Sequence, residues 1–411
     1  MRKKIPIAQV ALGMHLDELC GPWIEHSFWR TKFVLTDPAD IAKLHASEVK
    51  ECWIDTAKGA DIAAATDALR ERVPAAEPRA AAEPAAPASE GSSCRTSLQD
   101  EWARAVKLRA QAKQTVTVLF DQARLGRALE IEGCSSLVDE ISASVDRNAG
   151  ALTSLVRLKS HDDYTFMHSV AVCILMLALA KKLGLDDTQT RECGIAGLLH
   201  DMGKAKIPLE VLNKPGKLSD DEFALVKRHP QIGHDLLALS GLASAISLDV
   251  CLHHHERPDG RGYPDGLRHD ELSLHARMGA ICDVYDAITS KRPYKAGWNP
   301  ADSIAQMADW TKAGQFDPKV FRAFVDCVGI YPVGSLVRLQ SQRLAVVVEQ
   351  SEGLLVAPRV KVFFSVNSQM PVPTETLDLS ATACRDRIVA RESNDRWKFP
   401  YLDQLVAGVP A

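Results

Sequence analysis

The chain has 411 residues, of which 46% are hydrophobic and 25% are charged, and its formal net charge is −4. This length allows two or three domains with a sizeable core, and the composition is that of a globular protein. The slightly negative charge excludes a general nucleic-acid-binding surface, so any contact with phosphate must come from local basic residues.

The cysteines and the apolar segments indicate the compartment. Ten cysteines are scattered without a CxxC pair, which argues against a zinc ribbon and against a secreted disulfide framework. The basic start leads into an apolar run that Pro6, Gln9 and His15 interrupt, so we expect no signal peptide. The longest apolar run, from Val170 to Ala180, is shorter than the roughly 20 residues that cross a bilayer. We therefore expect a cytoplasmic protein without a membrane span.

Residues 1–72 are predicted to form a small α+β domain. Strand-like patterns occur at residues 5–14, 33–35 and 51–55. Asp37 and Pro38 are expected to open a short helix through Leu44, with Asp as the N-cap and Pro at the first helical position. Residues 73–97 are rich in Pro, Ala, Glu and Ser and lack the apolar residues of a core, so we expect a disordered linker.

The region from residue 98 to 330 is predicted to be mostly helical, with its core at about 140–330. Apolar residues at helical spacing predict helices within 98–158, at 165–183, at 187–199, at about 242–254 and at about 272–290. Ser219 and Glu222 form a capping box that opens a helix reaching His229. Asn299-Pro300 and Asp317-Pro318 are expected to open two further helices.

Residues 331–411 differ in character and are predicted to form a small β-rich appendage. Their β-branched and apolar residues predict strands at 335–339, 343–348 and 354–357. Residues 351–353, Ser-Glu-Gly, supply a turn between the second and third strands. The fold class expected for the whole chain is mainly α, with small strand-containing regions at both ends.

Histidine and aspartate pairs close two apolar helices and predict a site for two or more metal ions. His200-Asp201 ends one helix, and His254-His255 ends another. An imidazole gives one nitrogen to one cation, whereas a carboxylate can bridge two. His200-Asp201 alone would be interpreted as a surface pair, but Lys204, three residues after Asp201, places a cation where a substrate phosphate could be held.

Further candidates lie on other apolar helices. His168 and Asp283 are polar residues in apolar surroundings, and a buried carboxylate needs a cation or donors to offset its desolvation. Asp286, three residues after Asp283, shares its helix face. His229 alone would be an ordinary helix-end histidine. His253 and His234 are expected to lie outside the site.

The donor set contains imidazole and carboxylate without thiolate. It favours a catalytic centre of Fe, Mn, Zn or Mg over structural zinc. Two such metals, about 3.5–4 Å apart, activate a bridging water and stabilise the attacking and leaving oxygens in phosphoryl chemistry.

These motifs resemble the bacterial HD-GYP family, a branch of the HD metal-dependent phosphohydrolases with a Gly-Tyr-Pro signature. The resemblance covers about residues 140–335, and its motifs stand in family order: His168-Ser, His200-Asp201-Met-Gly-Lys204, His229-Pro, His254-His255-Glu256, Asp259-Gly-Arg-Gly262-Tyr263-Pro264, Asp283-Val-Tyr-Asp286 and Arg292-Pro-Tyr-Lys295. It implies an all-helical HD-type bundle that hydrolyses cyclic di-GMP, a bacterial second messenger, to pGpG or GMP.

The resemblance also implies the roles of individual residues. It assigns one metal to His168, His200, Asp201 and Asp283, and a second to Asp201, His229, His254 and His255. It assigns contacts with the substrate to Lys204, Tyr263, Arg292 and Lys295. Lys204 and Asp201 are then the catalytic residues, with Asp286 orienting a ligand. Without the family, Arg292 and Lys295 would be surface charges and Tyr263 a turn residue.

The number of metals follows from one departure from the family. Members with three metals carry a glutamate one helical turn before the first histidine, where this chain has Tyr164, with Asp163 one position off. We therefore expect two divalent ions, with Fe or Mn favoured and Mg or Zn as alternatives. This departure also biases the expected product toward the linear dinucleotide.

Two alternatives to cyclic di-GMP hydrolysis stay open. The chain could be a catalytically silent receptor or interaction module for a cyclic dinucleotide, or a hydrolase of another cyclic dinucleotide. The N-terminal unit resembles the small domain of unknown function that often precedes HD-GYP domains, through Gly13-Met14, Trp23, His26-Ser-Phe28 and residues 49–55. A sensor or docking role for it leaves a homodimer or a signalling partner open.

Overall fold

The computed structural model describes residues 2–20, 33–35, 41, 51–58, 98–157, 164–214, 216–290, 297–351 and 354–407. The chain divides into two compact units, Met1–Ser92 and Ser93–Ala411. Among the described residues, no helix combines the length and the apolar character needed to cross a membrane.

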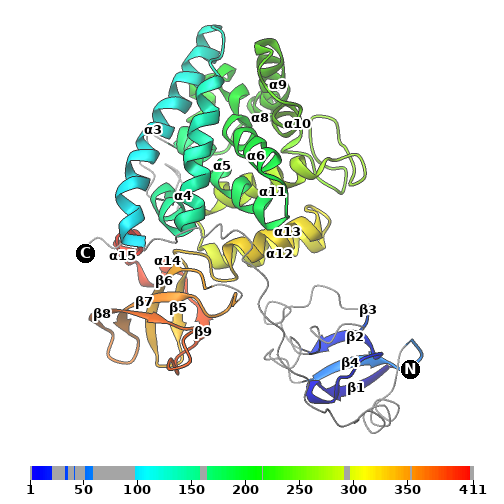
Figure 1. Ribbon diagram of the computed structural model, residues 1–411, viewed down its shortest axis with the longest axis vertical. Helices are drawn as coiled ribbons and strands as arrows, with labels where there is room; N and C mark the ends of the chain where they lie inside the picture. The colour runs from blue at the N-terminus through cyan, green and yellow to red at the C-terminus, as the bar shows by residue number, and fades with distance from the viewer. Residues whose placement is uncertain are drawn as a thin grey trace, which may run out of the picture. The chain divides into compact units, whose positions relative to one another are not determined.

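The first unit contains a four-stranded antiparallel sheet in the order β1-β4-β2-β3 (Figure 1). The strands are β1 (Arg2–Pro6), β2 (His15–Cys20), β3 (Phe33–Val34) and β4 (Glu51–Asp55), and a short 3-10 helix, η1 (Ile7–Gln9), follows β1. Side chains on one face, including Ile5, Leu16 and Ile54, are buried together and form its core.

Two differences separate this sheet from the prediction. The strand expected at 5–14 ends at Pro6, because the chain turns through η1 and then through Gly13, whose φ is +86°. Strand β2 was not predicted, since a bulge between Leu16 and Glu18 breaks its alternation. The helix expected at 37–44 lies outside the described residues except for Ile41, which is helical.

The second unit is a helical bundle followed by a small sheet domain (Figure 1). Its helices are α3 (Leu98–Leu125), α4 (Glu132–Arg157), α5 (Tyr164–Lys182), α6 (Asp187–Leu199), η4 (Met202–Lys206), α7 (Leu209–Leu212), α8 (Asp220–Val226), α9 (His229–Ser240), α10 (Ala245–His253), α11 (Leu274–Thr289), α12 (Pro300–Lys312) and α13 (Pro318–Val328). Helix α5 lies at the centre, because its run from Val170 to Ala180 is apolar on every face and packs against α3, α4, α6, α11 and α13.

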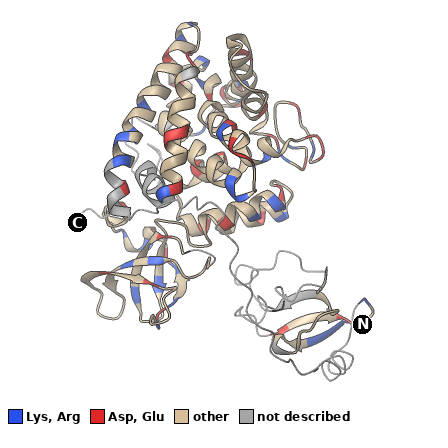
Figure 2. Ribbon diagram, viewed as in Figure 1, with Lys and Arg blue, Asp and Glu red and all other residues tan. Residues whose placement is uncertain are grey.

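The long antiparallel pair α3 and α4 covers one side of α5. Figure 2 shows acidic and basic residues interspersed along these outer helices. One pair joins them in the interior: the fully buried Glu101 of α3 accepts hydrogen bonds from Arg147 of α4 at 2.9 and 2.8 Å. These hydrogen bonds offset the cost of burying the Glu101 carboxylate and link α3 to α4.

The predicted helix starts are confirmed at the N-caps. Asp186 caps α6, Asn299 caps α12 and Asp317 caps α13, each accepting a backbone N–H with its side chain. The capping box of Ser219 and Glu222 is also present. Its helix is shorter than predicted, however: α8 ends at Val226, and His229 begins α9 instead of ending α8. Pro230 lies in the first turn of α9, where its missing N–H costs nothing.

The C-terminal region forms a five-stranded antiparallel sheet in the order β8-β7-β6-β5-β9. The strands are β5 (Leu336–Leu339), β6 (Arg343–Glu349), β7 (Arg359–Ser365), β8 (Met370–Asp378) and β9 (Ile388–Arg391), followed by α14 (Asn394–Trp397) and α15 (Leu402–Ala407). The first two were predicted. The strand expected at 354–357 is wrong: Leu354 and Val356 are about half exposed and precede β7. The turn expected at 351–353 lies partly outside the described residues.

Candidate metal centre

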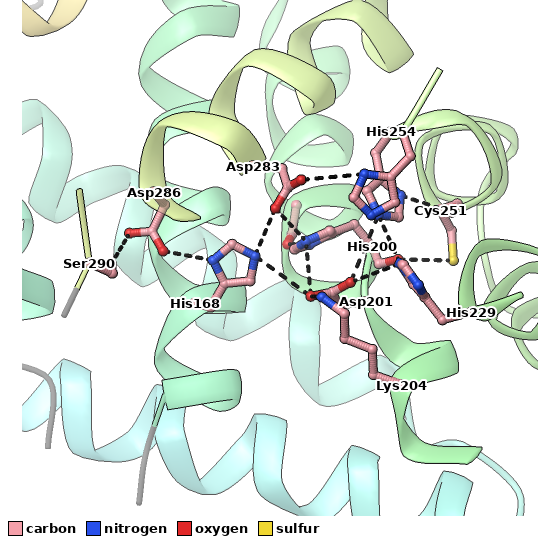
Figure 3. A network of polar contacts seen from close by, with 12 residues as sticks. His168, His200, Asp201, Lys204, His229, Cys251, His254, Asp283, Asp286 and Ser290 are labelled. Carbon is pink, nitrogen blue, oxygen red and sulfur yellow. Dashed lines mark hydrogen bonds and ion pairs between the residues drawn. The ribbon is translucent and has the colours of Figure 1, made fainter. Parts of the chain in front are cut away.

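The predicted metal ligands converge in the interior of the bundle (Figure 3). Each comes from a helix or from the residues directly after one: His168 from α5, His200 and Asp201 from the end of α6, His229 from the start of α9, His254 and His255 from the end of α10, and Asp283 from α11. Groups of three of these residues place one ligand atom each within 4.8 Å of one another.

The imidazoles are held by hydrogen bonds at Nδ1. Nδ1 of His200 donates to the Gly197 carbonyl oxygen at 2.8 Å, that of His229 to Val226 at 2.7 Å, and that of His254 to Cys251 at 3.0 Å. A carbonyl oxygen only accepts, so Nδ1 of each ring carries a proton, and Nε2 is the atom of each ring that can bind a cation. Such partners orient histidine ligands in metal sites.

The atoms at the centre are acceptors that face one another. Nε2 of His229 lies 3.3 Å from Nε2 of His254 and 3.3 Å from Oδ1 of Asp201. Nε2 of His200 and Oδ1 of Asp201 are buried without a hydrogen-bond partner among the described residues. Lone pairs at this spacing repel unless a cation lies between them. The donor set therefore fits bound metal ions.

The ionisation states also suit cations. Burial lowers the pKa of His255 to about 3, and it lowers the pKa of His200 and His254 as well. Burial alone would raise the pKa of Asp201, but the Lys204 ammonium and the nearby imidazoles outweigh it, so that pKa lies well below its usual value. The rings of His200, His254 and His255 are thus neutral and the Asp201 carboxylate is ionised, which are the forms that bind metals.

His168 differs from the other imidazoles because it lies between two carboxylates. Its Nδ1 contacts Oδ2 of Asp286 at 2.7 Å, and its Nε2 contacts Oδ1 of Asp283 at 2.9 Å. Burial opposes the charged ring, but these two carboxylates outweigh it and raise the pKa of His168. Asp286 in turn accepts a hydrogen bond from Ser290 at 3.2 Å, so it is itself held in place.

We expect Asp286→Ala to weaken metal binding about 10–100-fold, because His168 loses the group that fixes its ring. The measurement is the affinity for Mn²⁺, from titration of the metal-free variant and of the wild-type chain. Asp235→Asn, an exposed change on α9, is the control. Equal affinities for Asp286→Ala and the wild-type chain would show that His168 needs no partner.

Two predicted substrate contacts lie at the edge of this cluster. Lys204 is 22% exposed, and its Nζ donates to Oδ2 of Asp201 at 2.5 Å. The ring of Tyr263 stacks on that of His255, with centroids 4.8 Å apart. Arg292 and Lys295 lie outside the described residues, and so does Asp163. His253 pairs with Asp249 and His234 with Asp235, so neither joins the cluster.

Glu256 organises the segment that carries Tyr263, a role that the sequence did not reveal. It is 2% exposed, and it accepts backbone N–H groups from Asp265 at 2.6 Å, from Gly266 at 2.9 Å and from Leu267 at 3.1 Å. A Cβ at Gly262 would lie 2.4 Å from Cα of Glu256. Only glycine therefore allows the loop to fold so closely onto this carboxylate. Its position next to His255 was the only sequence signal.

We expect Glu256→Gln to destabilise the loop by about 1–3 kcal/mol, because its amide turns a donor toward a backbone N–H that loses its acceptor. Amide hydrogen exchange at residues 265–267 is the measurement, and faster exchange there is the expected result. Glu271→Gln, whose carboxylate accepts a hydrogen bond from the exposed Arg268 backbone, is the control. Unchanged exchange at 265–267 would contradict the role of Glu256.

Known proteins resemble this chain over its whole length. Residues 2–134 match the model of a domain of unknown function (DUF3391), and residues 151–320 match that of the HD domain. A cyclic di-GMP phosphodiesterase of Pseudomonas aeruginosa is 53% identical over 410 residues, which cover 100% of this chain and 96% of that protein.

Two further relatives match less than half of this chain. A cyclic di-GMP phosphodiesterase response regulator of Xanthomonas campestris is 38% identical over 48% of this chain and 52% of its own length. A 3'3'-cGAMP-specific phosphodiesterase of Vibrio cholerae is 35% identical over 42% of this chain and 40% of its own length. The Gly-Tyr-Pro loop beside the histidine cluster and the full-length match together show that the chain belongs to the HD-GYP family of HD-domain proteins.

Proposed function

We propose that this protein is a metal-dependent cyclic di-GMP phosphodiesterase. The observation that carries the proposal is the cluster of bare imidazole nitrogens and carboxylate oxygens at 3.3 Å spacing, in which Asp201 lies between two groups of histidines. The relative from Pseudomonas aeruginosa, a cyclic di-GMP phosphodiesterase similar over the full length, supports the choice of substrate.

The same cluster supports an assignment of the ligands to two metal ions. His168, His200 and Asp283 would hold one divalent ion, and His229, His254 and His255 a second, with Asp201 between them. Such ions stabilise charge on phosphoryl oxygens and activate water for attack. Lys204, whose Nζ contacts Asp201, would bind the substrate phosphate. Tyr263, Arg292 and Lys295 complete the proposed substrate contacts, and Asp286 orients His168.

Several finer points belong to the proposal. We propose two ions rather than three, Fe or Mn as the metals, and a linear dinucleotide as the main product. We also propose a domain at 1–72, a linker at 73–97, a catalytic region at 98–330 and a C-terminal domain at 331–411. The boundary between the compact units near residue 92 and the separate core of the C-terminal sheet support this division. A cytoplasmic location and a homodimer or partner through the N-terminal unit stay predictions.

A second candidate substrate is supported by the relative from Vibrio cholerae, which is specific for 3'3'-cGAMP. The metal ligands act on the phosphodiester group and do not distinguish one base from another. A silent receptor is disfavoured by the ligand cluster, because a protein that only binds has no need of facing lone pairs buried in its core.

The deciding experiment is a turnover assay on the full chain, purified without air and loaded separately with Fe²⁺, Mn²⁺ or Mg²⁺. Cyclic di-GMP and 3'3'-cGAMP are offered alone and in competition, and the products are separated by chromatography. We expect cyclic di-GMP to be consumed preferentially, with pGpG appearing first. Binding without turnover under every metal would support the receptor, and preferential loss of 3'3'-cGAMP would support the other substrate.

A further inference from the structure

The proposed substrate is larger than the metal cluster that would cleave it. A cyclic dinucleotide is a ring with two phosphodiester anions and two bases. A pair of metal ions with Lys204 serves one of the phosphates, so the second phosphate and the bases must contact residues outside the cluster. The described residues next to Tyr263 show which side chains could meet them.

Helix α8 and the residue after it place a cation near two aromatic rings, those of Phe223 and Tyr263. Phe223 and Lys227 are four residues apart, which puts them on one face of the helical turn. Nζ of Lys227 lies 4.7 Å from the centroid of the Phe223 ring and 5.5 Å from that of the Tyr263 ring. Because Tyr263 stacks on His255, these groups form a row that begins at a proposed metal ligand and ends at the surface.

The outer end of this row is open to a ligand. Phe223 is 47% exposed, whereas Phe321 and Phe324 of the bundle are fully buried. Lys227 is also exposed, and no carboxylate of the described residues forms an ion pair with it. Lys214 on the same side of the molecule is different, because its Nζ contacts Glu222 at 2.7 Å. An exposed ring beside a cation without an acidic partner is a surface suited to a base and a phosphate.

Neighbouring contacts fix the position of α8. Its first turn is fixed by the capping box, in which Ser219 and Glu222 bond each other's backbone N–H groups. The carbonyl oxygen of its last residue, Val226, accepts a hydrogen bond from Nδ1 of His229. The end of α8 therefore contacts a proposed metal ligand directly. The position of Lys227 is thereby coupled to the position of the cluster.

We propose that Phe223 and Lys227 form a second substrate subsite, in which the ring stacks on a purine base and the ammonium pairs with the phosphate that is not being cleaved. This inference rests on the proposed function, since it takes a cyclic purine dinucleotide as the ligand. It assigns α8 a part in selecting large cyclic substrates over small phosphodiesters. Tyr263 lies between the two sites, since its ring stacks on His255 of the metal cluster and lies near Lys227 of the subsite.

The test compares two substrates on the metal-loaded full chain. Lys227→Met removes the charge and keeps the apolar stem, and Phe223→Ala removes the ring. Each is expected to raise KM for cyclic di-GMP about tenfold, whereas kcat/KM for bis(4-nitrophenyl) phosphate, which has one phosphate and no purine, falls far less. Lys227→Arg should restore most of the affinity. Lys107→Met on α3 and Leu239→Ala on α9, both exposed and away from the row, are the matched controls.

The outcomes separate this inference from the proposed function. Equal losses on both substrates with a lower unfolding temperature would show that Phe223 and Lys227 only pack α8, and an unchanged KM for cyclic di-GMP would also reject the subsite. If the wild-type chain does not hydrolyse cyclic di-GMP, equilibrium dialysis with the same nucleotide replaces KM. A tenfold loss of binding in the variants would then uphold the subsite without the hydrolase, and no binding by the wild-type chain would reject both.

Discussion

Replacing Asp201 by asparagine is expected to lower the turnover of cyclic di-GMP by roughly a thousandfold or more. Its two oxygens face different histidines: Oδ2 lies 3.4 Å from Nε2 of His200, and Oδ1 lies 3.3 Å from Nε2 of His229. Asparagine keeps the shape but loses the charge, and it turns an NH2 group toward a ring nitrogen. Metal content per chain and steady-state turnover are the measurements, and both should fall together.

The unfolding temperature of the Asp201→Asn chain distinguishes a loss of metal from misfolding. In the metal-free chain the amide of Asn can donate to a histidine nitrogen that otherwise faces an acceptor, so the unfolding temperature without metal should be kept or raised. The exposed Asp235→Asn change on α9 is the control and should leave both metal content and turnover as they are. An Asp201→Asn chain that retains its metals and turns over within tenfold of the wild-type rate would refute the central role of this carboxylate.

Gly203→Ala is expected to destabilise the bundle by about 3 kcal/mol and to remove most of the activity. A Cβ at this position would lie 1.9 Å from the carbonyl oxygen of His229 and 2.6 Å from the backbone nitrogen of Gly233. Neither atom belongs to a side chain that could rotate away, so η4 and α9 must separate. His229 would move away from Asp201 as a result. Thermal unfolding followed by circular dichroism, together with turnover, measures both effects.

The matched control is Gly133→Ala, in the first turn of α4. A Cβ there meets no atom within 4 Å, so alanine should leave stability unchanged or raise it by up to about 1 kcal/mol. If Gly203→Ala unfolds at the same temperature as Gly133→Ala and keeps its turnover, the close approach of η4 to α9 does not position His229.

The helices of the bundle could be predicted because their signals are local. The start of α6 at Asp187 follows from the preceding Asp186, whose side chain caps the helix, and the starts of α12 and α13 follow from their Asn-Pro and Asp-Pro pairs. The convergence of the proposed metal ligands could be anticipated in part for a related reason, since adjacent His and Asp residues interrupt apolar helices where a charge would otherwise be costly.

The remaining features depend on contacts between distant residues. The role of Glu256 arises because a loop folds back onto it, and neither side carries a periodic pattern. Helix α9 begins at His229 because α8 ends at Val226, and the spacing of the apolar residues does not predict this helix end. Strand β8 was missed because it is an exposed edge strand containing Pro371 and Pro373, residues that lower strand propensity. The position of Lys227 near the rings of Phe223 and Tyr263 likewise could not be predicted, because it depends on how distant segments pack.

The proposed ligands come from positions that extend from His168 to Asp283, on helices brought together only by the complete bundle. An unfolded chain cannot present them as a set, so divalent ions held by these residues would bind the native state alone and would add to its stability in proportion to the logarithm of their free concentration. The facing lone pairs make the metal-free native state correspondingly less favourable. Scarcity of the metal would therefore lower the stability of the protein together with its proposed activity.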